Sequence, residues 1–463
     1  MSSIAISTKT QPVAGNLDQG STAVERRGFN STHWIMVAIV FAAAFLIYSF
    51  SWMAAPLSNT DTISYLEPLQ DFLANHHFTQ LHGRTPGLPL FLYLLGTGRT
   101  YFHATLLMHL MGVAALLFLL SRLQVRAALI WVVGLLMLLP CYVQNTAYLG
   151  TEAITETFLA LGFAGLCLFI LDRRPVYAVF GSFFFTWAGL TRPTNVFTPF
   201  LLAAILLLFP KKKLMRAAAL LVLIPGLIIG AYCTYTGVKF HYFGVSYLTG
   251  YHLSNATIEL YENIDDPVAR QILLEARTDM HVQGLTPNDA VWRARKQLKE
   301  RMGFTDPQLA AFLLKMNVRL ITHHPEGYLE EVARASCMFW FPYLTKVIDT
   351  KPVFKLLSDG LQLSVSAAFL FQVVVLGGLL AGGVVLNRKL VSLTDDPSLI
   401  YLLALAIIFQ TQILSCAIVG GSNARYRSVT DPLIIFAIAL VADWCLTTWR
   451  ASRDIPQQDR VSI

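Results

Sequence analysis

Long runs of apolar residues alternate with polar segments along the whole chain. A helix needs roughly 17–25 mainly apolar residues to cross a bilayer. Ten runs approach or reach that length: His33–Met53, Tyr101–Leu120, Ala127–Val143, Ala153–Leu171, Val176–Leu190, Asn195–Phe209, Leu214–Thr234, Leu361–Leu386, Leu399–Val419 and Leu433–Trp449. The pattern predicts an all-α polytopic membrane protein with about ten transmembrane helices.

Two of the polar segments are much longer than turns between helices. One runs from about Ala54 to Thr100, and the other from about Tyr235 to Gly360. The second contains Val268–Ala276 and Leu309–Ile321, where apolar residues recur at helical spacing. Loops of this length usually carry function. We therefore divide the chain into five parts. Residues 1–32 form a disordered tail, and residues 33–234 an N-terminal membrane module of about seven helices with its first loop at 54–100. Residues 235–360 form an amphipathic outer region, residues 361–449 about three C-terminal membrane helices, and residues 450–463 a second tail.

Basic residues mark alternate segments between the predicted spans. One set of segments carries Arg26, Arg27, Arg122, Arg126, Arg173, Arg174, Lys211, Lys212, Lys213, Arg216, Arg388, Lys389, Arg450 and Arg453. The opposite set carries Arg84, Arg99, Arg192, Arg425 and Arg427. Cytoplasmic loops are enriched in lysine and arginine. The asymmetry predicts that both termini are cytoplasmic and that both long segments lie outside the membrane.

The composition supports the membrane class. The 463 residues are 55% hydrophobic and only 14% charged, whereas soluble domains average about 45–50% and 25%. The net charge of +7 fits basic cytoplasmic loops, and the chain contains no nucleic-acid-binding motif. The six cysteines form no paired pattern and are interpreted as small apolar residues.

Polar motifs recur at the predicted outer ends of the spans. The first long segment has Asp61 and then Arg84-Thr-Pro-Gly-Leu-Pro-Leu-Phe. Later motifs are Gly150-Thr-Glu152, Gly189-Leu-Thr-Arg192-Pro193, His324-Pro-Glu-Gly-Tyr328-Leu and Arg425-Tyr426-Arg427.

In this order, and on this face, the motifs resemble those of the GT-C glycosyltransferase superfamily. The similar members are protein O-mannosyltransferases and the aminoarabinose and other sugar transferases of bacterial envelopes. The resemblance implies an enzyme of the bacterial inner (plasma) membrane with an extracytoplasmic active site. It also implies a polyprenyl-phosphate-linked sugar as donor, and an envelope polysaccharide, lipid or protein as acceptor. Where that family often has a second acid beside the first, this chain has Thr62, and it has Thr85 where a second proline is common.

The chemistry of such a transfer needs few residue types. An acceptor hydroxyl must lose a proton as it attacks the sugar, so a carboxylate can act as general base. The leaving phosphate needs arginine donors rather than a general acid. One displacement at the anomeric carbon would invert its configuration. We assign the base to Asp61, and substrate binding to Tyr65, His82, Arg84, Glu152, Arg192, Arg425 and Arg427.

Each assignment has a simpler alternative. Asp61 could cap a helix that begins at Thr62, and the arginines could anchor the protein at the lipid headgroups. Tyr65 could belong to the aromatic belt of the membrane interface, and the electrostatics of a helix start explain Glu152 almost as well as a role in binding sugar or orienting Arg192. The histidines leave a divalent metal open, with His82 as the best candidate, although their spacing matches no ligand pattern.

A second class of function competes with the enzyme. A transporter or flippase for a lipid-linked envelope precursor would also be polytopic. Transporters usually place ionisable residues at mid-membrane depth and show two similar halves. The predicted spans carry few charges, and the long outer region breaks any such symmetry. A non-catalytic scaffold would leave the ordered motifs unexplained.

Overall fold

The computed structural model describes residues 29–51, 56–58, 61–79, 81, 83–209, 211–285, 289–342, 352–385, 396–420 and 424–453. Regular structure in these ranges is helical, and the single β-bridge joins Leu57 to Tyr148. The protein is therefore an all-α polytopic membrane protein, as predicted. The expected N-terminal tail, up to residue 28, lies outside these ranges, as do residues 454–463.

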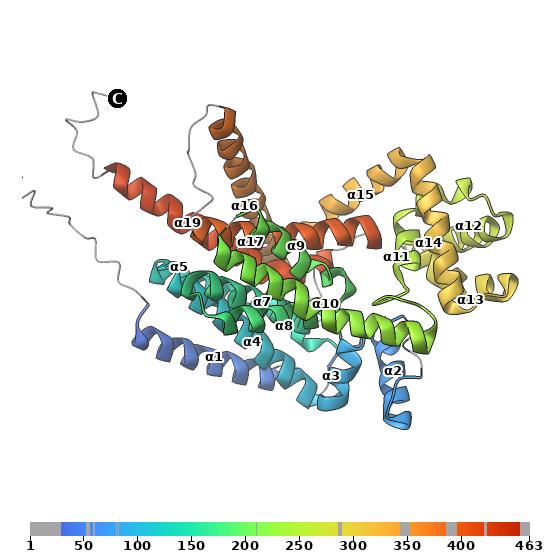
Figure 1. The fold of residues 1–463 in the computed structure, drawn as a ribbon, viewed down its shortest axis with the longest axis horizontal. Coiled ribbons are helices and arrows are strands. Elements are labelled where there is room, and N and C mark those ends of the chain that lie inside the picture. Colours follow the sequence, from blue (N-terminus) through green and yellow to red (C-terminus); the bar gives the residue numbers. More distant parts are fainter. Residues whose placement is uncertain are drawn as a thin grey trace, which may run out of the picture.

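The apolar runs of the sequence all coincide with helices (Figure 1). Seven of them are long and apolar enough to cross a membrane: α1 (Ser31–Ser51), α4 (Arg99–Arg122), α7 (Glu152–Asp172), α10 (Lys212–Phe240), α16 (Pro352–Val385), α17 (Asp396–Leu414, continued by the π-helical turn η5, Ser415–Val419) and α19 (Asp431–Arg453, preceded by α18, Ala424–Arg427, and η6, Ser428–Thr430).

The other three predicted spans are broken or short. Helix α5 (Ala127–Met137) and the segment formed by α6 (Pro140–Val143) and η1 (Gln144–Ala147) meet at a 61° bend and could form an eighth span. Pro140 begins α6 and cannot donate a backbone hydrogen bond, which accounts for the break. Helix α8 (Pro175–Thr191) has 17 residues, and η2 (Pro193–Asn195) with α9 (Thr198–Leu207) is shorter still. The count of ten thus remains a prediction.

Helix α7 forms the centre of the membrane bundle. Of the residues in its most apolar stretch, 78% are buried, against 17% for the corresponding stretch of α1. It packs closely on α8 through small residues. A Cβ at Gly165 would lie 3.0 Å from the backbone nitrogen of Gly181, so the two helices can approach only through glycine. Close contact through small residues is a typical way for membrane helices to associate.

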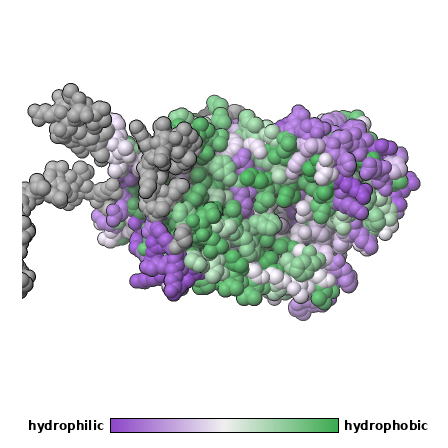
Figure 2. Space-filling view, turned by 45° about the horizontal axis from the view of Figure 1, so that its top comes forward, coloured by the Kyte–Doolittle hydropathy of each residue, from purple (hydrophilic) through white to green (hydrophobic). Residues whose placement is uncertain are grey.

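The region between α10 and α16 folds as a separate layer of helices at one end of the bundle (Figure 1). It comprises α11 (Thr249–Ala256), η3 (Ile258–Asn263), α12 (Pro267–Val282), α13 (Ala290–Met302), α14 (Asp306–His323) and α15 (Pro325–Phe339). The predicted amphipathic stretches lie in α12 and α14, and their apolar faces share one core. On the face that Figure 2 shows, hydrophilic surface gathers at this end and hydrophobic surface covers the middle of the molecule.

The first long segment forms two short helices, α2 (Thr62–Asn75) and α3 (Gly87–Leu95). They lie at the same end of the bundle as the α11–α14 layer (Figure 1). The structure therefore brings both long polar segments of the sequence together at one face.

Candidate functional site

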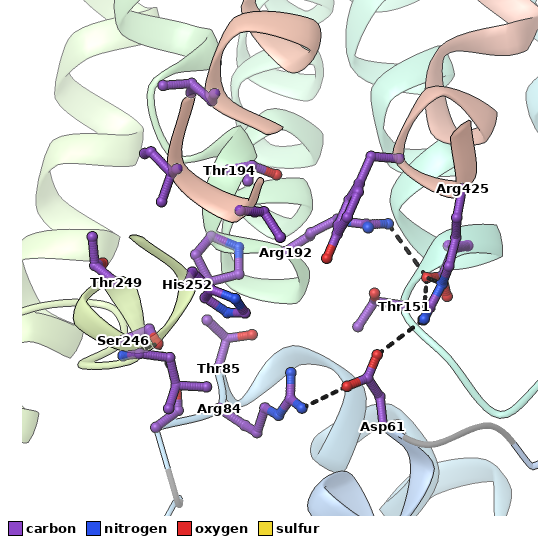
Figure 3. Close-up of a pocket in the computed structure, with 18 of the residues that line it drawn as sticks. Asp61, Arg84, Thr85, Thr151, Arg192, Thr194, Ser246, Thr249, His252 and Arg425 are labelled. Atoms are coloured by element: carbon purple, nitrogen blue, oxygen red, sulfur yellow. Dashed lines mark hydrogen bonds and ion pairs between the residues drawn. The ribbon is translucent and has the colours of Figure 1, made fainter. Parts of the chain in front are cut away.

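A hollow opens where the first polar segment, the ends of the membrane helices and α11 meet (Figure 3). Its volume is about 940 Å³, including the solvent at its mouth. Its lining comprises Asp61, Tyr65, Gly83, Arg84, Thr85, Thr151, Glu152, Arg192, Pro193, Thr194, Phe197, Ser246, Leu248, Thr249, His252, Leu414, Ile418, Val419, Arg425 and Tyr426. Six of the eight residues assigned to the site from the sequence meet here: Asp61, Tyr65, Arg84, Glu152, Arg192 and Arg425.

Hydrogen bonds to the segment 147–149 hold the chain in place on both sides of Asp61. The amide of Leu57 donates to the carbonyl of Ala147 at 2.8 Å, and that of Leu149 donates to the carbonyl of Leu57 at 2.9 Å. The hydroxyl of Thr62 donates to the Leu149 carbonyl at 2.9 Å. The side chain of Asp61 makes no capping bond to α2, although it stands at the N-cap position. The simple helix-capping explanation for Asp61 is therefore wrong.

Arg84 follows a tight turn that directs it toward Asp61. Gly83 adopts a φ of +78°, and a Cβ there would lie 2.6 Å from the side chain of Leu248, so the turn requires glycine. The Nη2 of Arg84 donates to Oδ1 of Asp61 at 2.9 Å, and its Nε donates to the Ser64 hydroxyl at 2.9 Å. The guanidinium also lies over the Tyr65 ring, 4.6 Å from its centre.

Arg425, from near the end of the chain, joins two carboxylates of its first third (Figure 3). Its Nη1 donates to Oδ2 of Asp61 at 3.0 Å, and its Nε donates to Oε1 of Glu152 at 2.6 Å. Glu152 also lies 3.5 Å from Nη1 of Arg192. Arg192 stacks over the ring of Tyr426, 4.2 Å from its centre, so the third arginine is fixed on two sides.

The network holds three arginines and two carboxylates, so its cations outnumber its anions. The side chains of Arg192 and Glu152 are only 8% and 4% exposed, whereas Asp61 is 35% exposed toward the hollow. Burial alone would raise the pKa of Asp61, but Arg84 and Arg425 outweigh it and lower the pKa to about 2. Asp61 is therefore ionised at neutral pH, and the site favours an additional anion.

Two assigned residues are not part of this arrangement. Arg427 is buried elsewhere, where it donates to Asp431, to the carbonyl of Trp340 and to the side chain of Gln362. These contacts tie α18 to α19, α16 and the end of α15, so the assignment of Arg427 to substrate binding is corrected to a structural role. His82 lies outside the described residues.

Several lining residues were missed from the sequence: Thr85, Thr151, Thr194, Ser246, Thr249 and His252. Thr85 follows Arg84, and Thr194 follows Pro193. Both threonines therefore stand beside motifs that the sequence analysis had already placed at the site. His252 lies in α11 without a motif around it, and only the fold brings it to the hollow. His323 and His324 line a different hollow, beside Lys315 and Arg319 on α14.

The described part of the chain has no group of three or more histidine, cysteine, aspartate or glutamate side chains placed to hold a metal ion. The polar groups of the hollow are mainly guanidinium and hydroxyl groups, which bind anions and sugars rather than cations. The site chemistry is thus that of an anion-binding pocket with one accessible carboxylate.

No protein-family model and no curated protein sequence matches the chain. Two solved structures resemble its fold. The archaeal oligosaccharyltransferase AglB from Archaeoglobus fulgidus, solved with an inhibitory peptide and a dolichol-phosphate, is 13% identical over 92% of this chain, with a TM-score of 0.47. ArnT from Cupriavidus metallidurans, bound to undecaprenyl phosphate, is 15% identical over 89% of this chain, with a TM-score of 0.38. The chain spans 52% of the length of the former and 78% of the latter.

Proposed function

We propose that the protein is a membrane glycosyltransferase of the GT-C type. It would move a sugar from a polyprenyl-phosphate donor to an acceptor hydroxyl at the outer face of the membrane, with inversion at the anomeric carbon. The observation that carries this proposal is the ion-paired Asp61, placed between Arg84 and Arg425 in a hollow at the end of a membrane-helix bundle.

The arginines are suited to a phosphate group. Arg192 is almost fully buried, and its Nη1 has no hydrogen-bond partner although it lies near Glu152. A buried donor without a partner costs free energy, which a ligand oxygen could recover. Arg84 lies in the same hollow, so two guanidinium groups could bind one phosphate and stabilise the charge that develops on it as it leaves.

The hollow also has an apolar side, which suits a lipid carrier. Phe197, Leu414 and Ile418 line it, and Phe197 is 56% exposed. Phe197 immediately precedes α9, Leu414 ends α17 and Ile418 lies in η5, so all three belong to the apolar helices of the bundle. A polyprenyl chain could therefore leave the arginines along this apolar side of the hollow.

Asp61 would act as general base for the acceptor. The acceptor oxygen forms a bond to the anomeric carbon while the bond from that carbon to the phosphate oxygen breaks. The hydroxyl proton passes to Asp61, and the electron pair of the broken bond stays on the phosphate. In the free protein Asp61 is a weak base because of its two arginine partners. A phosphate that takes over part of their hydrogen bonding would raise its basicity, which couples donor binding to catalysis.

The location and partners belong to the same proposal. We place the protein in a bacterial inner membrane with both termini cytoplasmic, residues 33–234 and 361–449 as membrane modules, and residues 54–100 and 235–360 outside. The acceptor would be an envelope polysaccharide, a lipid or a protein.

Release of polyprenyl phosphate tests this function against the transporter alternative. The purified protein would be incubated in lipid nanodiscs with a panel of undecaprenyl-phosphate sugars and a bacterial envelope extract as acceptor source. We expect acceptor-dependent release of undecaprenyl phosphate by the wild type, and release slower by on the order of 10²–10⁴ by Asp61→Asn. Movement of an intact lipid-linked sugar between leaflets of proteoliposomes, without its cleavage, would instead support a flippase.

A further inference from the structure

His252 is a titratable group in the hollow that the mechanism above does not use. It lies in α11, on the opposite side of the hollow from Asp61 and Arg425 (Figure 3). Its Nδ1 is buried and has no hydrogen-bond partner. On its other side the ring contacts Trp292 edge to face, with ring centres 5.7 Å apart. The imidazole is thus fixed by packing, while one of its polar atoms is left without a partner.

The charges around His252 come from three separate segments of the chain. Arg84 follows Gly83, Arg192 follows α8, and Asp61 precedes α2. Burial and then the two arginines lower the pKa of His252 to about 4, and Asp61 opposes them only in part. The ring is therefore neutral in the free protein at neutral pH, where an additional cation beside Arg84 and Arg192 would be repelled.

A bound phosphate would change this balance. It would place negative charge beside the same two arginines and remove the repulsion that keeps the ring neutral. The donor phosphodiester carries one negative charge, and the released monoester carries up to two near neutral pH, so positive charge beside the phosphate stabilises the product even more than the donor. A ring that is already protonated when the donor binds supplies this charge.

We propose that His252 is a substrate-contacting residue that binds the lipid-linked phosphate beside Arg84 and Arg192 and takes up a proton when it does so. This inference rests on the proposed function, because it concerns the same phosphate. In the bound state the ring donates a hydrogen bond to a phosphate oxygen, and its new charge offsets that of the phosphate. The proton comes from solvent when the donor binds, so the proton of the acceptor hydroxyl still passes to Asp61.

The experiment uses a ligand whose own charge does not change with pH. Farnesyl methyl phosphate, a phosphodiester, carries one negative charge throughout pH 5–8, whereas a phosphate monoester would titrate in that range. Its binding to the full-length protein in nanodiscs would be measured by calorimetry at several pH values. At one pH, buffers of different ionisation enthalpy would give the number of protons taken up.

Because binding favours the protonated ring, affinity should fall as pH rises, by up to about tenfold per pH unit between the free and the bound pKa, and then level off. We expect this fall and a fractional proton uptake in the wild type. His252→Gln keeps a neutral donor and should bind with an affinity that does not depend on pH. His323→Gln, an exposed control on α14, should behave as the wild type does.

A wild-type affinity that does not vary with pH, together with no proton uptake, would overturn the role of His252 and leave the phosphate site intact. The buffer series needs no variant, so it tests the proposal even if His252→Gln does not fold. Binding that stays pH-dependent in a folded His252→Gln would also overturn it. If the wild type does not bind the phosphodiester at all, the proposed function and this inference both fail.

Discussion

Asp61 and Arg425 are 364 positions apart in the chain, and their side chains form an ion pair of 3.0 Å. The pair joins the segment after the first membrane helix to the segment before the last one. Arg84 binds the other oxygen of the same carboxylate. Any change at Asp61 therefore affects two arginines as well as the proposed base.

This relationship predicts opposite effects on donor binding and turnover. Asp61→Asn removes the base and should lower kcat by on the order of 10²–10⁴. It also releases Arg84 and Arg425 from a negative charge, so the affinity for undecaprenyl phosphate should stay the same or rise. Turnover and equilibrium binding would be measured on the same preparation.

Asp71→Asn is the matched control for this experiment. Asp71 lies on α2 in the same segment, and its carboxylate accepts from the backbone amide and hydroxyl of Thr79 and from Asn75. The variant should retain most activity. A normal kcat for Asp61→Asn beside an inactive Asp71→Asn would reject Asp61 as the base.

A second prediction concerns the geometry of Arg84. Its guanidinium contacts Asp61, Ser64 and the face of Tyr65 at once. Lysine can supply the charge but not this planar set of donors. Arg84→Ala should weaken binding of the lipid phosphate strongly, and Arg84→Lys should recover only part of it. Arg99→Ala, at the start of α4 outside the hollow, should bind normally. Equal losses of donor and acceptor use in Arg84→Ala would indicate a structural role.

A third prediction follows from the pKa of Asp61. The free carboxyl group of an aspartate has a pKa near 3.9, and here it is lowered to about 2. The ion pairs therefore contribute their full stability above about pH 4, and this contribution is lost as pH falls toward 2. In the free enzyme, kcat/KM should show no acid limb from Asp61 between pH 5 and 8. An acid limb in this range whose midpoint moves in Asp61→Glu would contradict the low pKa.

The helices and the outer position of the motifs could be predicted from the sequence because hydropathy and charge bias are local properties. Each apolar run gave a helix, although its length alone did not show that Pro140 breaks one of them. Asp61, Arg84 and Arg192 were recognised beside short motifs. That Arg425 bridges Asp61 and Glu152 follows only from tertiary packing, since no spacing relates these three residues.

The error at Arg427 has a simple geometric cause. Residues two apart on a helix do not share a face, and Arg425 and Arg427 are two apart in α18. When Arg425 faces the hollow, Arg427 must face the bundle, where it is buried. His252 was missed for the opposite reason, because a single histidine in an amphipathic segment has no sequence pattern that marks its direction.

A fourth prediction concerns topology. The basic-residue asymmetry predicts that both long polar segments lie outside and both termini inside. A cysteine introduced at the exposed Asp289, in a variant that lacks the native cysteines, should react with a membrane-impermeant maleimide added to intact spheroplasts. A cysteine at Arg174, between α7 and α8, should react only after the membrane is permeabilised. Labelling of position 289 from the cytoplasmic side alone would reverse the predicted orientation.

The last prediction concerns a buried ion pair that lies away from the hollow. His109 on α4 approaches Oε1 of Glu156 on α7 with Nδ1 at 2.8 Å, and the carbonyl of Met137 with Nε2 at 3.0 Å. The Met137 carbonyl can only accept, so Nε2 donates to it, and with an ionised Glu156 the Nδ1 donates as well, which makes the two side chains an ion pair. Met137 is the last residue of α5, so this pair supplies the hydrogen bond that its carbonyl loses at the bend.

His109→Leu would leave Glu156 charged and buried without its partner, which typically costs about 3–5 kcal/mol. Removal of both charges in His109→Leu with Glu156→Leu should be less destabilising than the single change, because no unpaired charge remains. Thermal unfolding of the detergent-purified variants measures both, with His103→Leu on α4 as the control outside the pair. Equal destabilisation of the single and double variants would show that the two residues are not coupled.

A transporter that moved protons through this pair would require the histidine to exchange its proton with water. The side-chain exposures of 1% for His109 and 4% for Glu156 argue instead for a fixed structural charge pair that holds the broken helix in the bundle.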